Sequence, residues 1–184
     1  MDLAKDMALE CPSPEPDDST VCTGITPPET ITDSFDAVGN AELRIPTAPA
    51  PGNTFFIRSV ACGRFLKLFD GRLVLGHEDG CSSHWNCVEK DYWLGFKNMA
   101  SGNYLGHSGG QKADLRCSVP HHRQHEYFTI RPVEGEDYIA YVLLTTFRER
   151  LSFVRMEVAN EVESLVTSNN GSASDGIAWE FLKV

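Results

Sequence analysis

The sequence contains no long hydrophobic run. No segment approaches the roughly 18–20 consecutive apolar residues that a membrane-spanning helix needs. Residues 1–30 also lack the basic start and the apolar stretch of about 7–15 residues that mark a secretory signal. We therefore expect a cytoplasmic protein that does not insert into a membrane.

Positively charged residues are scarce. The chain has 16 Lys and Arg against 26 Asp and Glu, which gives a net charge of −10 at pH 7. Proteins that bind nucleic acids or anionic membrane surfaces need clustered Lys and Arg to neutralise phosphates. The acidic balance therefore argues against both kinds of partner.

Sequence signatures of catalysis are missing as well. The chain has no Gly-x-Ser-x-Gly nucleophile elbow, no Walker glycine loop and no dinucleotide-binding fingerprint. No pair of carboxylates is marked out by its spacing as an acid and a base. We therefore predict that the protein is not an enzyme and that it uses no cofactor.

The six cysteines are even in number, but without a secretory signal we expect a reducing compartment to keep them as thiols. Four residues combine the ligand types of a tetrahedral zinc site at tight spacing: His77, Cys81, His84 and Cys87. Structural zinc sites usually draw ligands from two knuckles, whereas these four crowd one loop. We predict no metal site and keep the four as candidate ligands.

The N-terminal part of the chain differs in composition from the rest. Residues 1–52 contain eight of the ten prolines, a single aromatic residue, and ten acidic against two basic side chains. A segment so poor in apolar groups cannot offset the entropy lost on ordering. We predict a disordered acidic tail over residues 1–52 and one folded domain over residues 53–184.

The predicted domain contains an internal repeat. Three copies begin with the apolar runs 55–58, 94–97 and 141–144, and each holds four short runs of strand length separated by turn residues. Period-two alternation points Phe55 and Ile57 inward. No copy can bury its apolar face alone, so the pattern predicts twelve strands that share one core.

Two further features of the repeat bear on its turns and its ends. Gly63 and Gly102 each precede an aromatic-Leu pair, which is typical of a turn with positive φ, and the third copy lacks this glycine. Trp85 and Trp179 open the last run of copies one and three and are predicted to be core residues, with His125 in their place in copy two. His125 also belongs to a basic patch in copy two, together with His121, His122 and Arg123.

Residues 98–107 resemble the N-x-x-S-G-x-Y-L phrase of fascin-type β-trefoils, and residues 179–184 resemble their W-E-x-F-x-V ending. The resemblance covers residues 53–184. It implies an all-β fold of the β-trefoil type, with three four-strand repeats that form a six-stranded barrel capped by three hairpins. In members with several trefoils it also implies the bundling of actin filaments.

Three functions remain open. The resemblance favours a non-catalytic module that binds filamentous actin or another protein, for which four basic residues are candidates if they share one face: Arg58, Lys97, Arg148 and Arg150. A glycan-binding lectin is the alternative, with Trp93 beside Tyr92 as the least constrained aromatic, although the Gln-x-Trp motif of ricin B lectins is absent. The third possibility is a passive scaffold that presents the acidic tail.

Overall fold

The computed structural model describes residues 44–110, 113–133 and 139–184. Most of the predicted tail, residues 1–43, lies outside the described residues. Residues 44–52, which the composition assigns to the tail, contact the domain. Thr47 N donates to Phe181 O at 2.9 Å, and Gly52 N donates to Cys87 O at 2.8 Å. The folded domain therefore includes residues before the predicted boundary at residue 53.

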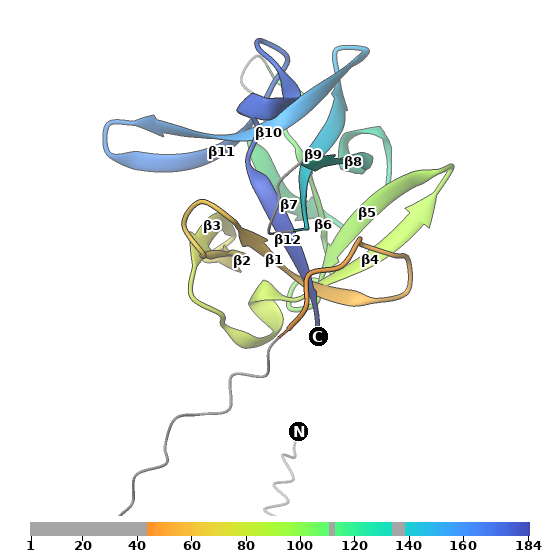
Figure 1. Cartoon of the computed structure of the whole chain (residues 1–184). Helices are drawn as coiled ribbons and strands as arrows, with labels where there is room; N and C mark the ends of the chain where they lie inside the picture. Colours follow the sequence, from red (N-terminus) through yellow and green to blue (C-terminus); the bar gives the residue numbers. More distant parts are fainter. Residues whose placement is uncertain (1–43, 111–112, 134–138) are drawn as a thin grey trace, which may run out of the picture. The chain divides into compact units, whose positions relative to one another are not determined.

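Twelve strands form three repeats of four (Figure 1). The first repeat contains β1 (Thr54–Ser59), β2 (Phe65–Phe69), β3 (Arg72–Gly76) and β4 (Trp85–Lys90). The second contains β5 (Trp93–Asn98), β6 (Tyr104–His107), β7 (Leu115–Val119) and β8 (Phe128–Val133). The third contains β9 (Ala140–Phe147), β10 (Arg150–Ala159), β11 (Val162–Ser168) and β12 (Ala178–Lys183). The short 3₁₀ turns η1 (Gly80–Ser83), η2 (Gln124–Glu126) and η3 (Ala173–Asp175) precede the closing strands.

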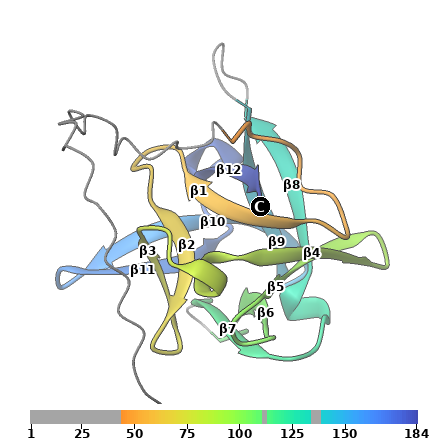
Figure 2. The ribbon, with the colours of Figure 1, turned by 90° about the horizontal axis from the view of Figure 1, so that it is seen from below.

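The first and last strands of the repeats pair in a closed ring. β1 pairs with β4 and β12, β5 pairs with β4 and β8, and β9 pairs with β8 and β12. The middle strands pair as the hairpins β2–β3, β6–β7 and β10–β11. This arrangement is a β-trefoil, the fold that the family resemblance implied, and it contains the twelve strands that the repeat pattern predicted. The β4–β5 turn and the β10–β11 hairpin project from opposite sides of the domain in both views (Figure 1, Figure 2).

The strand register makes the repeats equivalent. Phe55 lies opposite Trp85, Leu94 opposite Phe128, and Tyr141 opposite Trp179. The closing aromatic of the second repeat is therefore Phe128, and the prediction that His125 takes this place is wrong. Residues 124–126 instead build the 3₁₀ turn that precedes the strand, and His125 is exposed.

The core lies where the three repeats meet. Trp85, Phe96, Phe128, Trp179 and Phe181 are fully buried, which confirms the prediction for the two tryptophans. The ring of Phe96 stacks on that of Phe181 with centroids 5.5 Å apart. Each such side chain contributes roughly 1.5–3 kcal/mol by leaving water. The inward orientation predicted for Phe55 and Ile57 is also confirmed, since both belong to the main cluster of core residues.

Two equivalent turns need glycine. Gly63 and Gly102 have φ values of 66° and 70°, in the left-handed region that side chains disfavour, as their position in the repeat predicted. The third repeat builds this turn with Arg148 and Glu149, whose φ values are 51° and 63°. Within the described residues, no helix has the length and apolar character needed to cross a membrane.

Candidate ligand-binding surfaces

The four basic residues proposed for filament binding lie in three different places. Arg58 in β1 donates from Nε to Glu180 Oε2 at 2.7 Å, so its charge is paired. Lys97 lies in β5, with its Nζ 6.0 Å from the centre of the Tyr104 ring. Arg148 lies in the β9–β10 turn, and Arg150 is the first residue of β10. Their common role in binding stays a prediction.

The four candidate zinc ligands do not converge. The His84 ring packs edge-on against Phe56, with centroids 4.7 Å apart, and Cys81 is exposed. Cys87 is buried in the core, where burial, with a smaller effect from Glu89, raises the pKa of its thiol to about 12. A thiol that stays protonated is a poor metal ligand. Among the described residues, no group of three or more His, Cys, Asp and Glu could hold a metal ion.

Four partly exposed rings form a continuous row on the second repeat, which we call the aromatic strip: Trp93, Tyr127, His122 and Tyr104. Trp93 and Tyr127 are stacked with centroids 5.8 Å apart and planes inclined by 5°. Tyr127 meets the edge of His122 at 5.0 Å, and His122 stacks on Tyr104 at 5.4 Å. The strip thus joins β5, β6 and the segment between β7 and β8.

A carboxylate lies beside the Trp93 end of the strip. Asp91 and Tyr92 form the β4–β5 turn with φ values of 52° and 65°, and the next residue, Trp93, opens β5. Tyr127 Oη donates to Asp91 Oδ2 at 3.2 Å. Tyr92 at the tip of the turn is 96% exposed. The arrangement therefore presents aromatic faces, a phenol and a carboxylate together near solvent.

His122 is fixed across the β5 backbone by the lack of a side chain at Gly95. A Cβ atom on Gly95 would lie 2.6 Å from His122 Nε2. That nitrogen lies 3.3 Å from the carbonyl oxygen of Leu94, which can only accept, so Nε2 carries the proton of this hydrogen bond. Desolvation lowers the pKa of His122. The ring is therefore held in one orientation in the middle of the strip.

A smaller pocket of about 340 Å³ lies beside β7 and η2, and we call it the arginine pocket. Its polar lining consists of Arg116, His121, Arg123, Gln124, His125 and Glu126. Arg116 comes from β7 and the others come from the segment that leads into β8. The basic patch noted in the sequence thus forms one side of this pocket.

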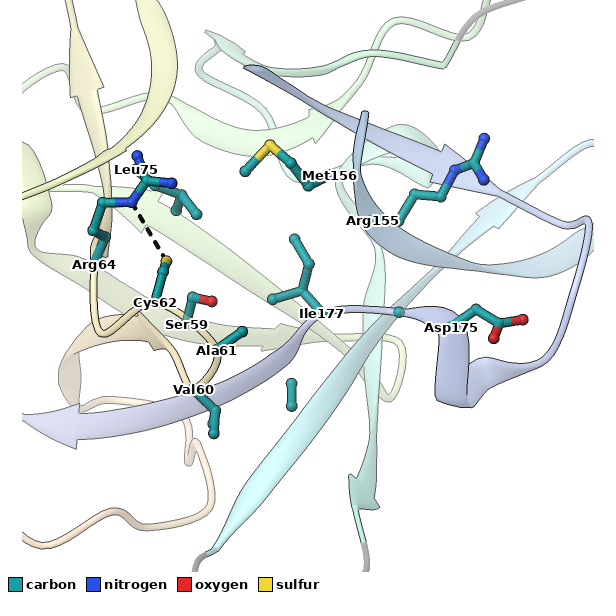
Figure 3. A pocket seen from close by; sticks show the side chains of 12 residues that line it. Ser59, Val60, Ala61, Cys62, Arg64, Leu75, Arg155, Met156, Asp175 and Ile177 are labelled. Carbon is teal, nitrogen blue, oxygen red and sulfur yellow. Dashed lines mark hydrogen bonds between the residues drawn. The ribbon is translucent and has the colours of Figure 1, made fainter. Parts of the chain in front are cut away.

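A cavity of about 660 Å³ lies between the first and third repeats. Figure 3 shows Met156 and Ile177 at its centre and the Cys62 and Arg64 side chains at one side. Arg64 Nε donates to Cys62 Sγ at 3.4 Å. No aromatic residue lines this cavity, so its lining does not match the aromatic and polar surface expected for a sugar.

No protein-family model and no curated protein matches the sequence. Solved structures are similar to it. A ricin B-like lectin of Macrolepiota procera in complex with lactose is 15% identical, with a TM-score of 0.59 over 75% of this chain and 100% of that one. The designed 3-fold symmetric protein ThreeFoil is 14% identical, with a TM-score of 0.55 over 71% of this chain and 99% of that one.

A third similar structure is the Polyporus squamosus lectin bound to the epitope Neu5Acα2-6Galβ1-4GlcNAc. It is 16% identical, with a TM-score of 0.56, and the match covers 74% of this chain and 50% of that one. At such low identity these likenesses show the fold alone. They support the β-trefoil and do not single out the fascin type.

Sequence reasoning identified one member of the aromatic strip, Trp93, and missed the others. Tyr104 was visible only as the second-repeat counterpart of Phe65, and Tyr127 only as part of an apolar run. His122 was noted for its charge and not as an aromatic ring. Three chain segments have to be brought together to form the strip, so no local spacing pattern marks it.

Proposed function

We propose that this protein is a non-catalytic carbohydrate-binding β-trefoil and that the aromatic strip is its binding surface. The faces of a sugar ring carry apolar C–H groups, which pack well on the electron-rich faces of Trp and Tyr. Its hydroxyl groups need hydrogen-bond partners at the edge of the same contact. The strip offers both kinds of group.

The observation that carries this proposal is the Trp93–Tyr127 stack with the Asp91 carboxylate beside it. Tyr127 occupies one face of Trp93, and among the described residues no other ring stacks on that indole. Asp91 lies at this end of the strip, where it accepts from Tyr127 Oη, and its carboxylate can also accept hydrogen bonds from sugar hydroxyl groups. Support also comes from the fold, since two similar structures are lectins bound to saccharides.

Actin-filament binding, which the family resemblance implied, has weaker support. It needs a contiguous basic face, and the candidate residues Arg58, Lys97, Arg148 and Arg150 lie in three places, with Arg58 paired to Glu180. The scaffold alternative depends on the acidic tail, most of which lies outside the described residues. Neither alternative has an observation comparable to the stacked pair beside a carboxylate.

A glycan array probed with the full chain tests the proposal. Wild type should bind a defined set of saccharides, and Trp93→Ala and Asp91→Asn should each lose most of that signal. Asn tolerates the left-handed backbone at position 91, so the second variant removes only the charge. Phe69→Ala, at an aromatic 61% exposed on β2, is the matched control and should bind as wild type does.

An array without signal for wild type would refute carbohydrate binding. Equal signals from wild type and Trp93→Ala would instead place the sugar elsewhere on the domain. Thermal unfolding of each variant separates a lost contact from a lost fold.

A further inference from the structure

Two arginines of the arginine pocket form no ion pair with any of the described residues. Arg116 and Arg123 line it from two sides, and His121 and His125 add two further nitrogen-bearing rings. Five ion pairs occur among the described residues, and none of them includes Arg116 or Arg123. The pocket therefore presents two guanidinium groups without a carboxylate partner.

The one carboxylate in the lining, Glu126, is turned toward the backbone. Glu126 is 4% exposed, and its Oε2 accepts from Arg123 N at 3.2 Å. Its other oxygen faces Gly106, where an added Cβ atom would lie 2.9 Å from Oε1. Burial raises the pKa of Glu126, with smaller opposing effects from the Arg123 backbone and nearby positive charges. This group therefore fixes the loop and leaves the arginines available.

Arg116 has a specific reason to accept a ligand. Its Nε is buried and has no hydrogen-bond partner. A buried donor without an acceptor is costly, so a ligand oxygen that reached Arg116 Nε from the pocket would remove that cost. The planar guanidinium group donates two parallel hydrogen bonds to a carboxylate, sulfate or phosphate group. The pocket thus fits an anionic oxygen group.

The other repeats provide an internal comparison. The segments that correspond to residues 120–126 are residues 77–83 in the first repeat and 169–175 in the third. Those two segments contain no Lys or Arg and three carboxylates, Glu78, Asp79 and Asp175. Positive charge at this position is therefore particular to the second repeat, which also carries the aromatic strip.

One segment supplies both surfaces. His122 and Tyr127 belong to the strip, whereas His121, Arg123 and His125 line the pocket. We infer that the arginine pocket takes the carboxylate or sulfate group of an acidic saccharide. This inference rests on the proposed carbohydrate binding and makes it specific, because it names the class of sugar.

The test compares three sugars that differ in one group: lactose, sulfated lactose and sialyllactose, each titrated into the full chain by calorimetry. Sodium sulfate alone is the fourth probe. Wild type should bind at least one acidic sugar about tenfold or more tightly than lactose, as expected for a charged hydrogen bond gained. Arg116→Gln should abolish this preference and leave lactose binding unchanged.

Arg123→Gln provides a second variant at an exposed residue, in case Arg116→Gln disturbs β7, and it should weaken the preference in the same direction. Arg150→Gln is the control and should change nothing. Equal affinity for lactose and both acidic sugars, or a preference that survives both pocket variants, would overturn the inference while carbohydrate binding stands.

Two other outcomes are distinguishable. Binding of sulfate that depends on Arg116, without binding of any sugar, would show an anion pocket that does not serve a saccharide and would overturn the inference. Failure of all four probes, together with a silent glycan array, would remove the proposed function and this inference with it.

Discussion

His107 Nε2 lies 2.8 Å from the carbonyl oxygen of Thr146, so that a buried side chain of β6 is tied to the backbone of β9. The Gly109 amide donates to the other ring nitrogen, Nδ1, at 3.1 Å. Nδ1 is therefore an acceptor and Nε2 a donor, which defines a neutral imidazole of one tautomer. Protonation would place a hydrogen between Nδ1 and the Gly109 N–H and break that contact.

This geometry predicts a loss of stability in mild acid. Burial lowers the pKa of His107 in the folded state, against an unfolded value of about 6.5. The hydrogen bond to the Thr146 carbonyl opposes this effect in part, and His125 and Arg116 lower the pKa slightly further. The unfolded chain therefore binds the proton more readily, and the His107 contribution is complete above about pH 6.5 and decreases as the pH falls toward the folded pKa. His122 shifts in the same direction.

Urea unfolding at pH 7.5 and pH 5.5 measures this effect. His107→Gln keeps a donor toward Thr146 and removes the ionisable ring, so it should lose less stability than wild type between the two pH values. Equal losses in wild type and variant would mean that His107 does not control the acid response.

Because Phe128 closes the second repeat, alanine substitutions at Phe128 and at His125 should reduce the stability of the fold by different amounts. Phe128 is fully buried and packs edge-on against Phe96 at 5.9 Å, so Phe128→Ala should cost roughly 3–5 kcal/mol. His125 is exposed, and His125→Ala should cost less than about 1 kcal/mol. Denaturant unfolding of the two variants distinguishes them, and the reverse order would restore His125 as the closing residue.

The fold was largely predictable because its signals are local. Phe55 and Ile57 are two residues apart in β1 and both belong to the core cluster, and the turns at Gly63 and Gly102 have the same positive φ in two copies. The error at His125 arose because the 3₁₀ turn before each closing strand varies in length and sequence. Aligning the short apolar runs therefore placed His125, instead of Phe128, at the position that Trp85 and Trp179 occupy.

The tail boundary and the site depended on contacts that sequence spacing does not encode. Arg44 lies 4.3 Å from the centre of the Phe56 ring and pairs with Glu78 at 2.9 Å, so it belongs to the domain despite its position in a proline-rich segment. The aromatic strip and the Arg116 side of the pocket likewise arise only when β5, β6 and β7 are brought together.

Two glycines of the second repeat should respond differently to an added methyl group. At Gly106 the Cβ atom would meet the His125 backbone oxygen and Glu126 Oε1, each at 2.9 Å, so Gly106→Ala should cost roughly 1–3 kcal/mol. At Gly95 the three nearest atoms all belong to the His122 ring, a side chain that the added methyl group would displace from its place in the strip. Gly95→Ala should therefore keep most of its stability and weaken sugar binding.

Thermal unfolding and a glycan array, applied to both variants, check this contrast. A large loss of stability in Gly95→Ala, or full glycan binding with His122 displaced, would contradict the role of His122 in the strip.

The cysteines should differ in reactivity toward iodoacetamide at pH 8. Partial burial pushes the pKa of the Cys62 thiol up, but hydrogen bonds from Ser59 and Arg64 outweigh this and lower it. Burial raises the pKa of Cys87 to about 12 and also raises that of Cys117. Because the thiolate is the nucleophile, peptide mass spectrometry should find Cys62 modified well before the two buried thiols. Arg64→Gln should slow the labelling of Cys62, because it removes a hydrogen bond that lowers the pKa of this thiol. Labelling of Cys87 that is faster than that of Cys62 would contradict the burial of Cys87 in the core.

The most direct test of carbohydrate binding at the strip uses the three tryptophans as reporters. Trp85 and Trp179 are fully buried, and Trp85 Nε1 donates to Leu66 O at 2.9 Å, whereas Trp93 is partly exposed on the strip. In a nitrogen–proton correlation spectrum of the full chain, each indole N–H gives one signal, and Trp93→Phe identifies the signal of Trp93. Titration with the saccharide that gives the strongest array signal should shift the Trp93 signal and leave the other two in place. A Trp93 signal that does not move at saturating sugar would contradict the account.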